Sequence, residues 1–215
     1  MRYNKKILIV SLLVGVGFIT IIGIHSNSAN RYEKENKATG KEETDIYKAA
    51  KISKDILEKT GEYDPLNVDE DAIDVKAGKM ADALGKDKEQ LKKDITDNSE
   101  QTKALYMAAK DYGITVSEAE TDEALNELKN ILHSSEDGQK QLDAVLAGLG
   151  MSEEEYWEAS RVQYETNIYI NKYLDARCEE ILQDKDKEGI TADSIDERNE
   201  LVEKITKEAV KKYIK

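Results

Sequence analysis

Hydrophobic residues recur every three or four positions through most of the chain after residue 41, which is the spacing of one face of an α-helix. Stripes of this kind predict helices over 42–60, 67–84, 86–112, 117–132, 139–147 and 152–183, and a last helix after residue 193. Polar or glycine-containing stretches separate them, including loops over 134–138 and 184–193. The pattern predicts an all-α fold in which the helix after residue 152 is unusually long.

Two serines predict the starts of helices in the middle of the chain. Ser117 follows a turn at Gly113 and precedes Glu120 by three positions, and Ser152 precedes Glu155 in the same way. In a capping box the serine hydroxyl accepts a hydrogen bond from the third helical amide, and the glutamate accepts one from the serine amide. Both helices therefore have well-defined predicted starts.

The long predicted helix carries two apolar faces. Trp157 and Tyr164 belong to a broad apolar arc, and they either line a peptide groove or form part of the core; regular helical spacing of aromatic residues favours the core. A second stripe lies away from this arc, and it is the better candidate for a surface that binds a peptide or partner, unless another helix covers it. This stripe consists of Val162, Thr166, Tyr169 and Tyr173.

The N-terminus has the pattern of an export signal. Residues 1–6 are basic, and 7–24 form an uncharged apolar run whose length of about 27 Å as a helix suffices to cross a bilayer core. The basic flank predicts a cytoplasmic n-region and an exported body. An uncleaved transmembrane signal anchor is favoured over a cleaved signal peptide, because the run is long and the cleavage motif is weak. Residues 25–41 are polar and predict a flexible tether to a helical domain over 42–215.

Charge narrows the range of partners. The chain has 215 residues and a formal net charge of −13. Such an acidic body repels nucleic-acid phosphates and anionic lipid headgroups, so nucleic acid is not an expected partner. Steering of basic or unfolded polypeptides is compatible with this charge.

Side chains with catalytic or metal-binding chemistry are scarce. Cys178 is the single cysteine, which excludes an internal disulfide, and it is expected to be buried. His25 and His133 are the two histidines, so the usual zinc patterns are missing. Residues 184–189 resemble half of a calcium loop, but Ile195 stands where the bidentate glutamate is needed. No catalytic residues, metal site or cofactor are predicted.

Three segments in a fixed order resemble the N-terminal helical chaperone domain of the SurA, PrsA and trigger-factor-like group of peptidyl-prolyl isomerases. They are Ala108–Ser117, Glu120-x-Asp122-x-x-Leu125 and Leu149–Trp157. The resemblance implies a helical extracytoplasmic module that cradles unfolded polypeptides. The family normally carries a parvulin isomerase domain after the long helix, but the 41 residues after Leu174 are too few for one. The resemblance therefore implies no isomerase activity here.

We expect an N-terminal transmembrane helix followed by an extracytoplasmic multi-helix bundle with one long helix and a returning C-terminal helix. The expected function is non-catalytic binding of unfolded or secreted polypeptides by a chaperone-like module anchored in the cell membrane through residues 7–24. The alternative is a structural or adaptor protein that holds one specific folded partner in a cell-envelope assembly.

Overall fold

The computed structural model describes residues 47, 50–55, 58, 64, 66, 69–187 and 195–214. The described residues are helical apart from short turns, and they contain no strand. The helices are α4 (Glu70–Leu84), α5 (Lys88–Tyr112), α6 (Glu118–His133), α7 (Glu136–Leu149), α8 (Glu153–Lys187) and α9 (Ile195–Tyr213). Residues 50–55 are helical as well.

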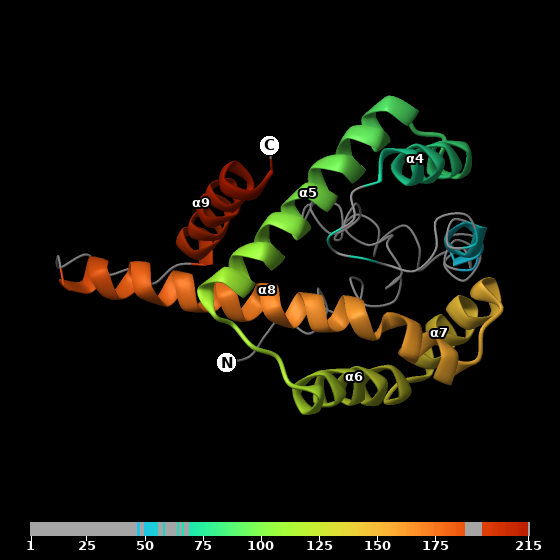
Figure 1. Cartoon of the computed structure of the whole chain (residues 1–215). Coiled ribbons are helices and arrows are strands. Elements are labelled where there is room, and N and C mark those ends of the chain that lie inside the picture. The colour runs from blue at the N-terminus through green and yellow to red at the C-terminus, as the bar shows by residue number, and fades with distance from the viewer. Residues whose placement is uncertain are drawn as a thin grey trace.

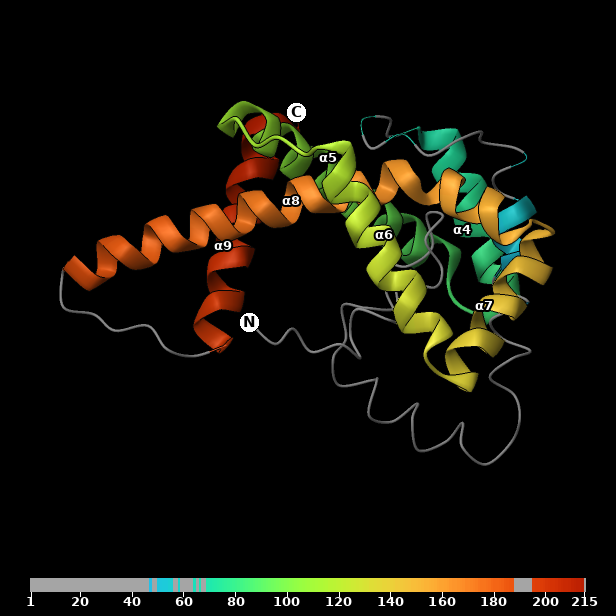
Figure 2. The same cartoon turned by 90° about the horizontal axis from the view of Figure 1, so that it is seen from below.

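Helix α8 runs across the molecule, and the other helices are arranged along it (Figure 1). Helix α5 crosses α8 and carries α4 at its far end, whereas α6 and α7 form a hairpin at the start of α8 (Figure 2). Helix α9 returns to pack against α5 and the later part of α8. The expectations of one long helix and of a returning C-terminal helix are therefore confirmed.

The hydrophobic core consists of four clusters. One joins α6, α7 and the start of α8; a second joins α4 to the first half of α5. The third joins the end of α5 to the middle of α8 and to α9, and the fourth joins α8 to α9. The two arms, α4 with the start of α5 and α6 with α7, therefore have separate cores.

Both predicted capping boxes are present. The Ser117 amide donates to the Glu120 carboxylate at 2.9 Å, and the Glu120 amide donates to the Ser117 hydroxyl at 3.3 Å. Ser152 and Glu155 make the same pair of contacts at 2.8 and 3.3 Å. The Lys172 ammonium also binds Glu120 at 2.6 Å, which ties the start of α6 to α8. The hydrogen bond with Lys172 makes the largest contribution, and together these contacts lower the pKa of Glu120 to about 2.

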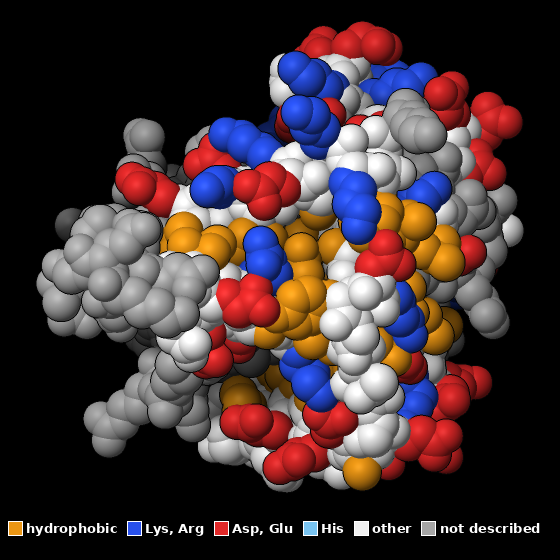
Figure 3. Space-filling view, turned by 60° about the vertical axis from the view of Figure 1, so that its left-hand side comes forward, with side chains coloured by type: hydrophobic (Ala, Val, Ile, Leu, Met, Phe, Trp, Pro, Cys, Tyr) orange, Lys and Arg blue, Asp and Glu red, His pale blue; other side chains and the backbone are white. Residues whose placement is uncertain are grey.

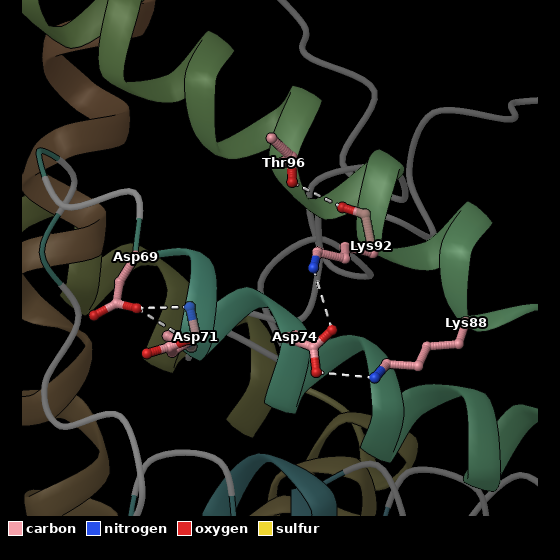
Figure 4. A network of polar contacts seen from close by, with 7 residues as sticks. Asp69, Asp71, Asp74, Lys88, Lys92 and Thr96 are labelled. Carbon is pink, nitrogen blue, oxygen red and sulfur yellow. Dashed lines mark hydrogen bonds and ion pairs between the residues drawn. The ribbon is translucent and has the colours of Figure 1, made fainter.

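Ion pairs join α4 to α5 (Figure 4). Asp69 caps α4 by accepting hydrogen bonds from the amides of residues 71 and 72. Asp74 accepts from Lys88 at 2.9 Å and from Lys92 at 3.2 Å, and these hydrogen bonds hold its pKa below the usual range. The acidic start of α4 thus serves as a cap and as an ion-pair partner for α5.

Two predicted loops are shorter in the structure. The predicted loop over 134–138 is wrong, because α7 begins at Glu136. Ser135 is its N-cap, and the Ser135 hydroxyl accepts a hydrogen bond from the Gly138 amide. The break at 184 is also wrong, since α8 continues to Lys187. Residues 184–187 of the calcium-loop pattern are therefore helical, and 188 and 189 lie outside the described residues.

The N-terminal predictions fall outside the described residues, because the structure describes none of residues 1–46. The candidate signal anchor at 7–24 and the tether at 25–41 both belong to this part. Within the part of the chain that the structure describes, no helix has the length and apolar character needed to span a bilayer.

Candidate functional site

The first two candidate residues lie in the core. Trp157 and Tyr164 are buried together with Tyr156 where α8 meets α6 and α7. The indole N–H of Trp157 donates to Glu153 Oε1 at 2.9 Å, and His133 Nε2 lies 2.9 Å from the same oxygen. The alternative that assigned both aromatic residues to the core is the one that agrees with the structure. Their side chains fix the α6–α7 hairpin to α8.

The second stripe is covered along part of its length. Val162 is 49% exposed, Tyr173 is half-buried, and Thr166 and Tyr169 are buried. The Thr166 hydroxyl donates to the Val162 carbonyl at 2.8 Å within α8. Tyr106 of α5 packs against the Tyr169 ring, so α5 covers this part of α8. A continuous exposed stripe is therefore not present, and the binding role of these residues stays a prediction.

A cluster of tyrosines brings α5, α8 and α9 together. The rings of Tyr106 and Tyr169 meet edge to face with centroids 5.4 Å apart, and those of Tyr112 and Tyr173 do so at 5.6 Å. Tyr213 of α9 packs in the same apolar cluster as Tyr173. We call these five residues the tyrosine cluster. Of its members, Tyr112 is 41% exposed, Tyr169 is buried, and the other three are half-buried.

A lysine lies over the aromatic rings. The ammonium of Lys110 is 3.7 Å from the ring centroid of Tyr169 and 5.2 Å from that of Tyr106. Interaction with Tyr169 raises the pKa of Lys110, so the side chain stays protonated at neutral pH. A protonated amine over two ring faces is a cation–π arrangement. It gives this part of the cluster a positive charge on an otherwise acidic protein.

Carboxylates orient the tyrosine hydroxyls at the edge of the cluster. Tyr112 donates to Glu180 of α8, and Tyr213 donates to Asp111 at 2.6 Å. The hydrogen bond from Tyr213, followed by that from Lys212, lowers the pKa of Asp111. The rings are thus held from both ends, by packing against each other and by their hydroxyls.

The space-filling view that brings the left side of Figure 1 forward shows how apolar surface is distributed on this face (Figure 3). Hydrophobic side chains gather in a band across the middle, with Lys, Arg, Asp and Glu side chains on both sides and within it. Such a surface contacts apolar side chains and pairs with charges of either sign. Among the described residues, no group of three or more His, Cys, Asp or Glu side chains is arranged to hold a metal ion.

A second contact region, between α4 and α7, was not predicted from the sequence. Residues 50–55 lie there, with Ala50 packed in the α6–α7–α8 cluster and Ile52 against the α4–α5 cluster. A Cβ on Gly148 of α7 would lie only 2.6 Å from the Ala50 Cβ. The Lys79 ammonium of α4 lies 3.1 Å from the Asp55 carboxylate. The predicted helix ended at residue 147, so Gly148 was taken as part of a turn, whereas α7 continues to Leu149. No local signal in the sequence indicated this close approach.

Comparison with known proteins identifies one protein family whose model matches this chain. The family model described as the SurA-like N-terminal domain matches residues 1–170. The match includes α4 to α7 and extends into α8. Neither the search of curated proteins nor that of solved structures found a match.

Proposed function

Since the chain belongs to the SurA-like N-terminal domain family, we propose that it is a chaperone-like module that binds unfolded or secreted polypeptides. The family match over 170 of the 215 residues is the observation that carries this proposal. It agrees with the resemblance seen in the capped turns around Ser117 and Ser152.

The tyrosine cluster supplies the binding surface in this proposal. Tyrosine rings contact apolar side chains of many shapes, and their hydroxyls and the neighbouring charges bind the polar groups of an extended chain. Because the rings are already held in place, little side-chain entropy is lost on binding. Such a surface favours broad recognition of polypeptides over selection of one sequence.

The proposed activity is binding without catalysis. A parvulin domain contains a sheet, and the described residues are helical without a strand. Helix α9 takes the place at which the family's returning helix closes the domain, packing on α5 and α8. We therefore assign no isomerase step to this chain.

The proposed location is the outer side of a cell membrane. The basic residues 1–6 and the uncharged run 7–24 support export and retention by a signal anchor. With the tether over 25–41, this arrangement holds the helical domain close to the membrane, where exported chains emerge unfolded.

A direct test measures protection of an aggregating client. The full chain in lipid nanodiscs is added to chemically denatured citrate synthase on dilution, with empty nanodiscs as the blank. We expect slower growth of light scattering, and a Tyr112→Ala variant to protect less. Tyr47→Ala is the matched control, since Tyr47 is 42% exposed and lies outside the cluster.

Scattering that grows at the same rate with the protein and with empty nanodiscs would refute the proposal. Pull-down from solubilised envelope then distinguishes the alternative function. A mixed set of captured chains agrees with a chaperone, whereas one stoichiometric folded partner favours the adaptor.

A further inference from the structure

Residues 50–55 connect two arms whose cores are otherwise separate. Ala50 belongs to the cluster of α6, α7 and α8, and Ile52 packs against the cluster of α4 and α5. The ion pair between Lys79 and Asp55 adds a polar contact to α4. Figures 1 and 2 both show this short helix lying between α4 and α7. We call the surface of α4 and α7 that it covers the docking surface.

A helix can bind the docking surface only if its backbone comes very close to α7. Gly148 has no side chain, and a Cβ there would lie 2.7 Å from the carbonyl oxygen of Tyr47 and 3.2 Å from the amide nitrogen of Lys51. A backbone atom of Tyr47, which precedes the segment, and one of Lys51 within it therefore lie where an alanine methyl would need space. The helix that binds here must present small side chains where it crosses α7.

The two buried side chains of the segment are small. Ala50 and Ser53 are each 3% exposed, whereas the larger Ile52 is half-buried. Burial of alanine and serine side chains removes less apolar area from water than burial of leucine or phenylalanine. These contacts therefore hold the segment more weakly than α8 is held by Tyr156 and Trp157.

We propose that the docking surface is a second polypeptide-binding site, and that residues 50–55 occupy it as an internal competitor. The inference rests on the proposed function. The competing partner is a client segment that coils into an amphipathic helix, with small side chains facing Gly148 and a carboxylate placed to pair with Lys79. Binding of such a client displaces residues 50–55.

The size of the effect follows from the competition. If the segment occupies the surface about 90% of the time, only about 10% of molecules are free to bind there, and the apparent Kd is about tenfold weaker than that of a free surface. A change that expels the segment tightens binding by up to this factor. A change that fixes the segment removes binding at this site.

The test uses the full chain in lipid nanodiscs and reduced, carboxymethylated α-lactalbumin, which is permanently unfolded, as the probe. Ala50→Lys puts a charge on the buried face of the segment, where Ala50 is 3% exposed, so it expels the segment and leaves α4 and α7 unchanged. Tyr47→Lys is the matched control, because Tyr47 is 42% exposed. As a second measurement, tryptic cleavage after Lys51 and Lys54 is followed in the wild type with and without the probe.

We expect Ala50→Lys to bind the probe up to about tenfold more tightly than the wild type and Tyr47→Lys. The probe should also speed tryptic cleavage after Lys51 and Lys54 in the wild type. Circular dichroism checks folding; if Ala50→Lys is unfolded, the cleavage rates of the wild type decide. Equal affinity of folded Ala50→Lys and the wild type, or an unchanged cleavage rate, would overturn the inference and leave the proposed function intact. Failure of every protein to bind would overturn both.

Discussion

Alanine in place of Gly148 should destabilise the protein, whereas the same change at Gly78 should stabilise it. Both glycines lie inside helices, and alanine is favoured over glycine in a helix interior by about 0.5–1 kcal/mol. At Gly78 nothing opposes this gain, since the nearest atom to the added Cβ is a flexible Lys88 carbon at 3.7 Å. We therefore expect Gly78→Ala to raise the free energy of unfolding by about 0.5–1 kcal/mol.

At Gly148 the helix gain is outweighed by overlap. The added Cβ lies 2.6 Å from the Ala50 Cβ and 2.7 Å from the Tyr47 carbonyl, so the segment has to move. Overpacking of this kind costs about 1–3 kcal/mol, which leaves a net loss of up to about 2.5 kcal/mol. The helix gain is common to both variants, so they should differ by the overpacking cost of about 1–3 kcal/mol.

Urea unfolding followed by the fluorescence of Trp157 measures this difference. It is the only tryptophan and lies in the same buried cluster as Ala50. Stabilisation of both variants by the same amount would refute the close contact between residues 50–55 and α7. A fall in the slope of unfolding for Gly148→Ala would indicate that the segment has left the folded core.

Three further predictions test other parts of the structure. Tyr169→Ala should cost about 3 kcal/mol in a denaturant titration because the ring is buried, whereas Val162→Ala on the same helix should cost under about 0.5 kcal/mol; equal losses would contradict the packing of α5 on α8. Cys178 is fully buried and burial raises the pKa of its thiol, so Ellman's reagent should react within minutes only in denaturant; rapid reaction of the folded protein would contradict this burial. The contact with Glu153, followed by that with Gln139, raises the pKa of His133, so its contribution is present below the unfolded pKa of about 6.5 and is lost as pH rises through the folded value. Between pH 6 and 8.5, the free energy of unfolding from thermal melts should fall by a few tenths of a kcal/mol more in the wild type than in His133→Ala. Parallel pH profiles of the two proteins would refute the contact.

The positions of the helices along the chain were predictable, because the motifs that mark a helix start lie within a few residues of it. Capping boxes at Ser117 and Ser152 set the starts of two helices within a few residues of sequence, and both are present. The start of α7 was missed because Ser135 caps it without a glutamate three positions later, so only half of the motif is there. The extension of α8 to Lys187 has no apolar stripe to reveal it.

Contacts between helices were less predictable. Periodicity placed Tyr169 on a face of α8, but it gives no information on which helix covers that face. Its partner Tyr106 lies far away in the sequence, on α5. Lys110 over the Tyr169 ring follows from the crossing of α5 and α8, which local spacing does not determine. The candidate surface therefore moved from one stripe on α8 to tyrosines from three helices.

Contact between the tyrosine cluster and an unfolded chain is the central claim, and site-specific photo-crosslinking tests it most directly. A benzophenone side chain replaces Tyr112 in one protein and Leu66 in another, both as full chains in lipid nanodiscs with reduced, carboxymethylated α-lactalbumin. Leu66 is 45% exposed and lies outside the tyrosine cluster and the docking surface. Our account predicts a cross-linked product from position 112 that unlabelled client competes away, and much less from position 66. Equal yields at the two positions, or none at position 112, would contradict it.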